Sequence, residues 1–145
     1  MVVARVQWLR DHTSLVTLSE PALMAIAAAI QVEVLQENRR LILEETPPPA
    51  FYILRSGRLE SYHTSKTTAA LAVSLLPGSI LHLKELLLDQ PADRTIISLS
   101  DCELWVIPRP EFLAIAQQYP EIGQIFSRQL ASELDQMAAQ LVYER

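Results

Sequence analysis

Seven short segments within residues 32–108 constrain the fold more than any other feature of the sequence. Each is rich in residues that favour strands, and together they are residues 32–35, 41–43, 51–54, 59–62, 71–75, 94–99 and 103–107. Turn residues separate them, among them the TPPP run at 46–49 and the pairs that end at Gly57 and Gly78. Short strands at this close spacing predict an antiparallel sandwich or barrel rather than a parallel sheet.

Helical periodicity precedes this β region. Residues 1–31 predict two helices, of which the first is short and amphipathic. The second begins after Ser19, which can cap it, and has Pro21 in its first turn. We expect Met24 and Ile26 of this helix to pack in the core.

Two further helical segments are predicted later in the chain. Residues 81–88 contain the run KELLL and predict a short helix embedded in the β region. Residues 109–145 predict one helix, a break at 119–120, and a longer helix with an apolar stripe over residues 122–142. This stripe predicts either a helix that folds back on the strands or a dimerisation helix that meets its own copy.

Composition limits the classes of partner. The chain has 145 residues, a length that suits one domain, and its 12 basic against 17 acidic residues give a net charge of −5. Because there is no basic excess, we expect no nucleic acid to bind this chain alone. Cys102 is the only cysteine, which excludes an internal disulfide and a CxxC pair. With no signal peptide and no apolar run long enough for a bilayer, we expect a cytoplasmic protein without membrane association.

Catalytic motifs are lacking. His12, His63 and His82 lie on separate segments, with no nucleophile or carboxylate at motif spacing. No P-loop or GxGxxG motif occurs among the three glycines. Glu44 and Glu45 precede prolines in a turn, and we interpret them as a solvated charge pair. The sequence therefore predicts that the chain is not an enzyme and uses no metal.

One strand-turn-strand segment carries a family resemblance. Residues 51–59 read FYILRSGRL and resemble the YxIxSGxV motif of the cyclic-nucleotide-binding domain family, which includes catabolite activator proteins and regulatory subunits of protein kinase A. Residues 76–78 are similar to the family's LxxG turn, residues 101–107 to its last strand, and residues 112–122 to the helix and break that follow. The resemblance covers nearly the whole chain.

This resemblance implies a mainly β fold with flanking helices. The expected core is a double-stranded β-helix, or jelly-roll barrel, over residues 32–108 with the short helix embedded in it. N-terminal helices occupy residues 1–31, and residues 109–145 end in a long C-terminal helix. The whole is expected to be a single domain and a module of a longer protein.

In this family a phosphate-binding cassette holds the cyclic phosphate of the ligand. The cassette reads FGE, then a short helix, then arginine followed by Ser, Thr or Ala, and residues 83–95, LKELLLDQPADRT, match it here. The resemblance implies that Arg94 pairs with the phosphate and that Glu85 accepts a hydrogen bond from the ribose 2′-hydroxyl. The implied ligand-binding residues are Lys84, Glu85, Leu86, Leu87, Arg94 and Thr95.

The cassette departs from the family pattern. Lys84 stands in place of the glycine, and a second register instead places His82 at the glycine and Leu83 at the glutamate, which removes the ribose acceptor. Asn38 and Glu45 stand at two turn glycines of the family, where Asn tolerates a left-handed backbone and Glu does so less readily. Alternatives for the key residues are a surface Arg94 paired with Asp93 or Asp89, and a Glu85 on a solvated helix face.

The expected function is a regulatory, ligand-sensing module for signal transduction. It binds cAMP or cGMP as a regulatory ligand, needs no other cofactor, and signals through its C-terminal helices. The alternative is a degenerate domain that binds no nucleotide and serves protein interaction or homodimerisation through residues 122–143. A third hypothesis is a sensor of another small anionic ligand, held by Lys84 and Arg94.

Overall fold

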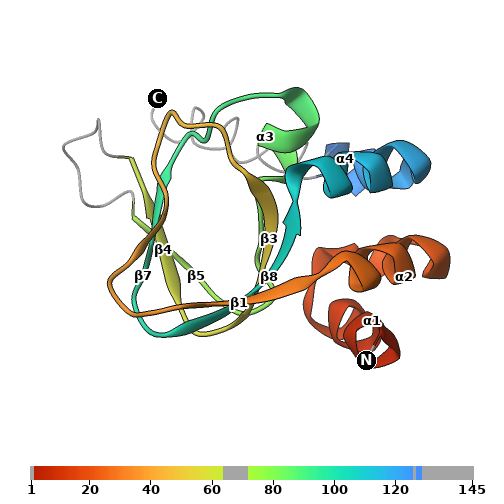
Figure 1. Cartoon of the computed structure of the whole chain (residues 1–145), viewed down its shortest axis with the longest axis horizontal. Helices are drawn as coiled ribbons and strands as arrows, with labels where there is room; N and C mark the ends of the chain where they lie inside the picture. The colour runs from red at the N-terminus through yellow and green to blue at the C-terminus, as the bar shows by residue number, and fades with distance from the viewer. Residues whose placement is uncertain (1, 64–71, 126, 129–145) are drawn as a thin grey trace, which may run out of the picture.

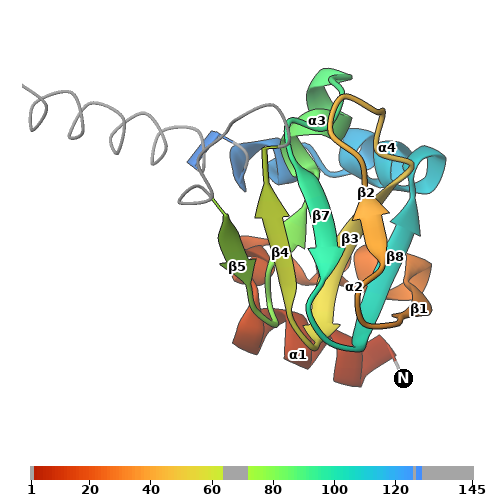
Figure 2. The same cartoon turned by 90° about the vertical axis from the view of Figure 1, so that its left-hand side faces the viewer.

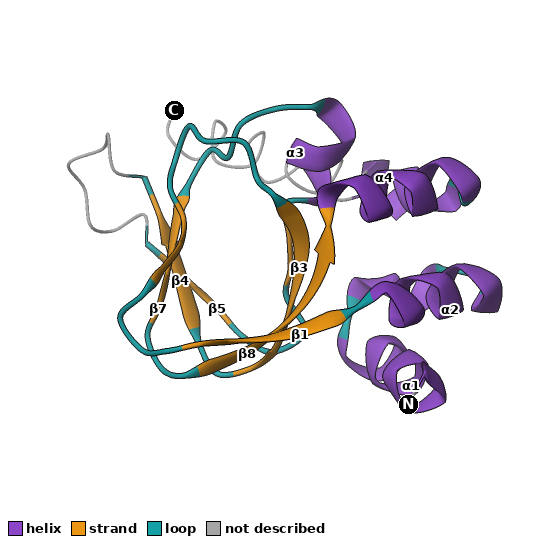
Figure 3. Cartoon of the chain, in the orientation of Figure 1, coloured by secondary structure: helices purple, strands orange, loops and turns teal. Residues whose placement is uncertain are grey.

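The computed structural model describes residues 2–63, 72–125 and 127–128. Its described strands form two antiparallel four-stranded sheets, and its helices gather on the outer side of one of them (Figure 1, Figure 3). The helices are α1 Val2–His12, the 3-10 helix η1 Ser14–Thr17, α2 Glu20–Ala29, α3 Leu83–Leu88 and α4 Arg109–Gln118. The strands are β1 Gln31–Leu35, β2 Arg40–Ile42, β3 Ala50–Ser56, β4 Leu59–Tyr62, β5 Val73–Leu75, β6 Ile80–Leu81, β7 Thr95–Ser98 and β8 Cys102–Pro108.

The two sheets have the strand orders β1-β8-β3-β6 and β2-β7-β4-β5, which is a jelly-roll-like arrangement. Figure 2 shows β2, β7, β4 and β5 side by side, with β3 and β8 behind them. Among the described residues no ladder joins one sheet to the other, so the expected jelly-roll is present as two sheets and no closed barrel is found there. The chain passes between the sheets through the turns at 36–39 and 76–79. Positive φ angles at Asn38 and Gly78 take the backbone out of strand conformation there.

Strands β3 and β8 separate two hydrophobic cores. On β3, Phe51 and Ile53 face the helices, whereas Tyr52 and Leu54 face the space between the sheets. This follows from the alternation of side chains along a strand. Both sets are buried, so β3 reads in sequence as an unbroken apolar run.

The helix boundaries confirm several predictions. The Oγ of Ser19 accepts a hydrogen bond from the backbone N–H of Ala22 and caps α2, which has Pro21 in its first turn. Ile26 is fully buried, but Met24 is 45% exposed, so the prediction of a core Met24 is wrong. Two residues along an α-helix turn the side chain by about 200°, which places Met24 and Ile26 on opposite faces.

The C-terminal helix is described only in part. α4 ends at Gln118, as the break at residues 119–120 predicts, and the backbone is helical again at residues 121–125 and 127–128. Ile122 and Ile125 are buried in the helical core, so the stripe begins by folding back onto the domain. The rest of the predicted long helix, including its dimerisation face, lies outside the described residues. Within residues 2–63, 72–125 and 127–128, no helix is long and apolar enough to cross a bilayer.

Two short elements were not predicted from the sequence, whereas the turns at Asn38 and Glu45 were anticipated. The two-residue strand β6 and the helix η1 were not predicted, because neither is long enough to show a period. Asn38 and Glu45 have φ angles of 61° and 71°, as expected for positions where the family has glycine. Gly57 has φ +93°, and a Cβ there would collide with the backbone oxygen of Asp101.

We expect Glu45→Gly to stabilise the domain. Glu45 is exposed and its φ of 71° is unfavourable for a residue with a Cβ, so glycine relieves strain and loses little contact. The free energy of unfolding in urea should rise by about 0.5–1 kcal/mol, since the greater entropy of unfolded glycine offsets part of the relief. Glu45→Ala keeps the Cβ and is the matched control, and equal effects of the two substitutions would contradict strain at this position.

Candidate ligand-binding site

A cavity of about 210 Å³ lies where α3, β6 and the segment before β7 meet. It is lined by Ile80, His82, Leu83, Lys84, Glu85, Asp93 and Arg94. Three of the six predicted ligand-binding residues, Lys84, Glu85 and Arg94, therefore share one cavity. The first two come from the first turn of α3, and Arg94 directly precedes β7.

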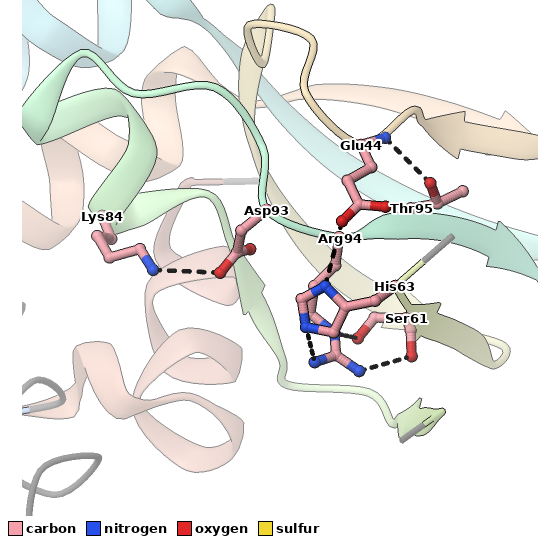
Figure 4. A network of polar contacts seen from close by, with 7 residues as sticks. All are labelled: Glu44, Ser61, His63, Lys84, Asp93, Arg94 and Thr95. Carbon is pink, nitrogen blue, oxygen red and sulfur yellow. Dashed lines mark hydrogen bonds and ion pairs between the residues drawn. The ribbon is translucent and has the colours of Figure 1, made fainter. Parts of the chain in front are cut away.

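The end of strand β4 holds the guanidinium of Arg94 (Figure 4). Its Nε donates to the Ser61 Oγ at 2.8 Å, its Nη2 to the Ser61 carbonyl at 3.2 Å, and its Nη1 contacts the His63 Nε2 at 3.0 Å. A guanidinium only donates, so the His63 Nε2 must accept, which in the neutral ring places the proton on Nδ1. That Nδ1 lies 3.2 Å from the Glu44 Oε1, to which it donates.

Lys84 joins the two sides of the cavity. Its Nζ lies 3.3 Å from the Asp93 Oδ2 and 3.8 Å from the Glu85 Oε1, so it bridges α3 and the residue before Arg94 (Figure 4). Asp89 pairs with Arg109. The contacts of Arg94 with β4 thus replace the surface pairing with Asp93 or Asp89 that the sequence left open.

Glu85 is a cavity residue and not part of a solvated face. Its side chain is 10% exposed although it lies in the first turn of a short helix. Glu44 also differs from expectation: its side chain is 10% exposed and contacts His63, so the prediction of a solvated pair is wrong for this residue. Tertiary packing buries both carboxylates, which local sequence does not reveal.

The other three predicted residues do not line this cavity. Leu86 is buried in the helical core and Leu87 packs against it. Thr95 is 1% exposed, and its Oγ1 accepts a hydrogen bond from the backbone N–H of Glu44 at 3.0 Å. The two leucines contact the helical core and Thr95 contacts Glu44, just after β2, and a ligand role for all three stays a prediction.

His82 has the backbone conformation of a glycine. It precedes α3 with φ 74°, which places the left-handed residue at the glycine position of the second register rather than at Lys84. Its ring packs edge-on against Tyr52, and its Nδ1 has no hydrogen-bond partner in the described part of the chain. Burial lowers the pKa of His82 to about 4, and the Asp93 carboxylate opposes this only in part.

Sequence reasoning missed Ser61, His63 and Glu44 as residues of the site. Ser61 and His63 are two residues apart and so point to the same face of β4. Tyr62 pairs with Thr95 in the β4·β7 ladder, which brings the ends carrying His63 and Arg94 together. The alternation of β4 is visible in the sequence, but its pairing with β7 is not.

Comparison with known proteins gives the family. A model described as the cyclic nucleotide-binding domain matches residues 32–119, which is more than half of the chain. The chain belongs to the cyclic nucleotide-binding domain family, as residues 51–59 suggested. Among curated proteins, none is significantly similar to it in sequence.

Solved structures agree with this fold. The Thermus thermophilus catabolite activator protein has a TM-score of 0.74 and 18% identity, over 88% of this chain and 60% of that protein. A putative cyclic nucleotide binding protein from Ruegeria pomeroyi has a TM-score of 0.72 and 20% identity, over 96% and 62%. The regulatory domain of Toxoplasma gondii PKA, solved with cAMP, has a TM-score of 0.66 and 26% identity, over 79% and 44%. The chain thus spans less than two thirds of the length of each of these proteins.

The buried His82 predicts a loss of stability in mild acid. Its pKa is about 4 in the folded chain and near 6.5 when unfolded, so between these values the unfolded chain binds the extra proton. The His82 contribution is complete above pH 6.5 and declines as the pH falls towards 4, by on the order of 3 kcal/mol in total. Urea unfolding at pH 4.5, 5.5 and 7 measures it.

His82→Asn is the matched control, because Asn tolerates a positive φ and does not titrate. The variant should show a shallower fall in unfolding free energy between pH 7 and 4.5 than the parent. Parallel curves for the two proteins would contradict a buried neutral His82.

Proposed function

We propose that this chain is a regulatory module that binds a cyclic mononucleotide, cAMP or cGMP, in the cavity between α3 and β7. The single observation that carries the proposal is Arg94, a cation anchored on β4 that lines the same cavity as Glu85. An arginine fork matches the geometry of a phosphate, and a carboxylate accepts from a ribose hydroxyl. The family membership and the relative solved with cAMP support this choice of ligand.

Lys84 gives this site a feature of its own. In the register that matches Glu85 to the family's glutamate, Lys84 stands in place of the glycine and adds a second cation, which pairs with Asp93 across the cavity. The phosphate of an entering ligand would compete with Asp93 for Lys84, and the ion pair would open. Lys84 thus supplies positive charge while its side chain occupies space near the expected phosphate.

Ligand entry should displace α3. The cavity of about 210 Å³ is smaller than the roughly 300 Å³ at which small-molecule sites begin. Leu83 and Leu86 anchor α3 in the same core as Phe112 of α4, whose ring stacks on Phe51. A shift of α3 should therefore change the packing of α4. A ligand that binds this changed packing more tightly moves the population towards it. We propose that this is the output signal, that the module acts without catalysis in the cytoplasm, and that the ligand is its only cofactor.

Removing Arg94 should abolish most of the nucleotide affinity. Calorimetric titration with cAMP and cGMP, beside 5′-AMP, is expected to show binding of at least one cyclic nucleotide. Arg94→Ala should weaken it at least about tenfold, since a hydrogen bond to a charged group contributes roughly 1.5–3 kcal/mol. Arg94→Lys keeps the charge but not the fork and should be intermediate, and unchanged affinity in Arg94→Ala would place the phosphate elsewhere.

Glu85 should recognise the ribose 2′-hydroxyl. Glu85→Ala is then expected to weaken cAMP by about tenfold and to leave 2′-deoxy-cAMP unchanged, because the deoxy ligand has no hydroxyl to donate. Titration of both ligands against both proteins forms a thermodynamic cycle with the parent as control. An equal loss for the two ligands would favour the second register, in which no residue accepts from the ribose.

Two other functions are outcomes of the same titrations. If neither nucleotide binds but inorganic phosphate stabilises the domain through Lys84 and Arg94, the chain is a sensor of another small anion. If no anion binds, the degenerate interaction module takes its place. Homodimerisation through residues 122–143 is then tested by the dependence of the mass on concentration in light scattering.

A further inference from the structure

Two residues at the end of β4, Ser61 and His63, contact the guanidinium of Arg94. Ser61 accepts from Nε through its hydroxyl and from Nη2 through its carbonyl, so one edge of the guanidinium lies against β4. His63 accepts from the remaining nitrogen, Nη1. The contacts to Ser61 and His63 thus involve all three guanidinium nitrogens.

The orientation of His63 is itself determined by a carboxylate. Because the His63 Nε2 accepts from Arg94, its Nδ1 carries the proton and donates to Glu44. The backbone N–H of Glu44 in turn donates to the Oγ1 of Thr95, the residue after Arg94. Arg94, His63, Glu44 and Thr95 thereby form a closed ring, which joins the ends of β2, β4 and β7 (Figure 4).

A neutral imidazole between Arg94 and Glu44 has a chemical consequence. A carboxylate placed directly on the guanidinium would compete with an incoming phosphate, because both are anions that take the same fork. The His63 imidazole instead lies between Arg94 and Glu44, so the Glu44 carboxylate acts on Arg94 through the ring. The arginine also loses its rotamer freedom before the ligand arrives, which lowers the entropic cost of binding.

We propose that His63, oriented by Glu44, is a positioning residue that holds Arg94 ready for an anionic ligand. The inference rests on the proposed function, in which Arg94 takes the cyclic phosphate. It gives His63 and Glu44 a role that the cassette motif does not contain, and it gives Thr95 the role of anchoring Glu44. Neither His63 nor Glu44 needs to touch the ligand.

Substitutions of His63 separate positioning from simple packing. His63→Gln keeps an acceptor near the position of Nε2, whereas His63→Leu has similar bulk and no acceptor. Titration with cAMP and cGMP should give affinities within about twofold of the parent for His63→Gln and about five- to tenfold weaker for His63→Leu. Affinity in His63→Leu equal to that of the parent overturns the proposal, as does an equal loss in the two variants.

Glu44 provides a second, linked test. Glu44→Ala should weaken binding in the parent about three- to fivefold but add little to His63→Leu, because in this proposal Glu44 influences Arg94 through the imidazole. Glu44→Gln keeps an acceptor oxygen for Nδ1 and should restore most of the affinity. Additive losses in the double variant would mean that Glu44 does not act through His63, and would overturn the proposal.

A ligand-free measurement distinguishes failure of this inference from failure of the proposed function. In 15N spectra, His63 of the parent should show protonated Nδ1 and unprotonated Nε2, and the Arg94 Nη1–H that contacts it should exchange slowly with solvent. His63→Leu should speed the exchange of that Nη1–H, and His63→Gln should not. If the parent binds no cyclic nucleotide but these signals appear as expected, the proposed function fails and the positioning role stands. A protonated Nε2, or an Arg94 unaffected by His63→Leu, overturns the positioning role itself.

Discussion

The burial of β3 and β8 on both faces is the constraint on which the rest of this structure depends. Their pairing provides one set of side chains to a core beneath the helices and the alternate set to a core between the sheets. Phe51 stacks on Phe112 of α4, while Tyr52, one residue later, lies against His82 on the opposite face. Because successive residues of one strand pack in different cores, displacing the strand from one core also disturbs its side chains in the other.

The candidate site lies where these two cores meet. Helix α3 is anchored in the helical core through Leu83 and Leu86, whereas the Arg94 segment continues into β7 of the second sheet. The Lys84–Asp93 ion pair connects the two sides across the cavity. In the proposed function, a ligand that binds between them changes the relative placement of α3 and the sheet. Helix α4 packs on β3 and contacts α3, and its response to that placement is the proposed output.

Much of the fold could be predicted from local patterns, and the site could be predicted only in part. The capping of α2 by Ser19 and the embedded helix depend on a few neighbouring residues, which the sequence displays directly. The left-handed turns at Asn38 and Glu45 were anticipated from the positions of glycines in the family. The family cassette led to Lys84, Glu85 and Arg94, which share one cavity. It did not lead to Ser61 or His63, because their contact with Arg94 depends on the pairing of β4 with β7 across more than thirty residues.

By itself the sequence determined which of the longer segments are strands or helices and where most turns fall, because periodicity, capping and turn chemistry are short-range. Its motifs also carried the resemblance to the family. Only the tertiary structure decided that the described strands pair as two separate sheets, and that Met24 faces solvent. It also decided that His82 is the residue with the left-handed backbone before α3, and that Glu44 is buried beside His63. These outcomes depend on contacts between segments that are far apart in the sequence, and local sequence patterns do not show which segments pack together.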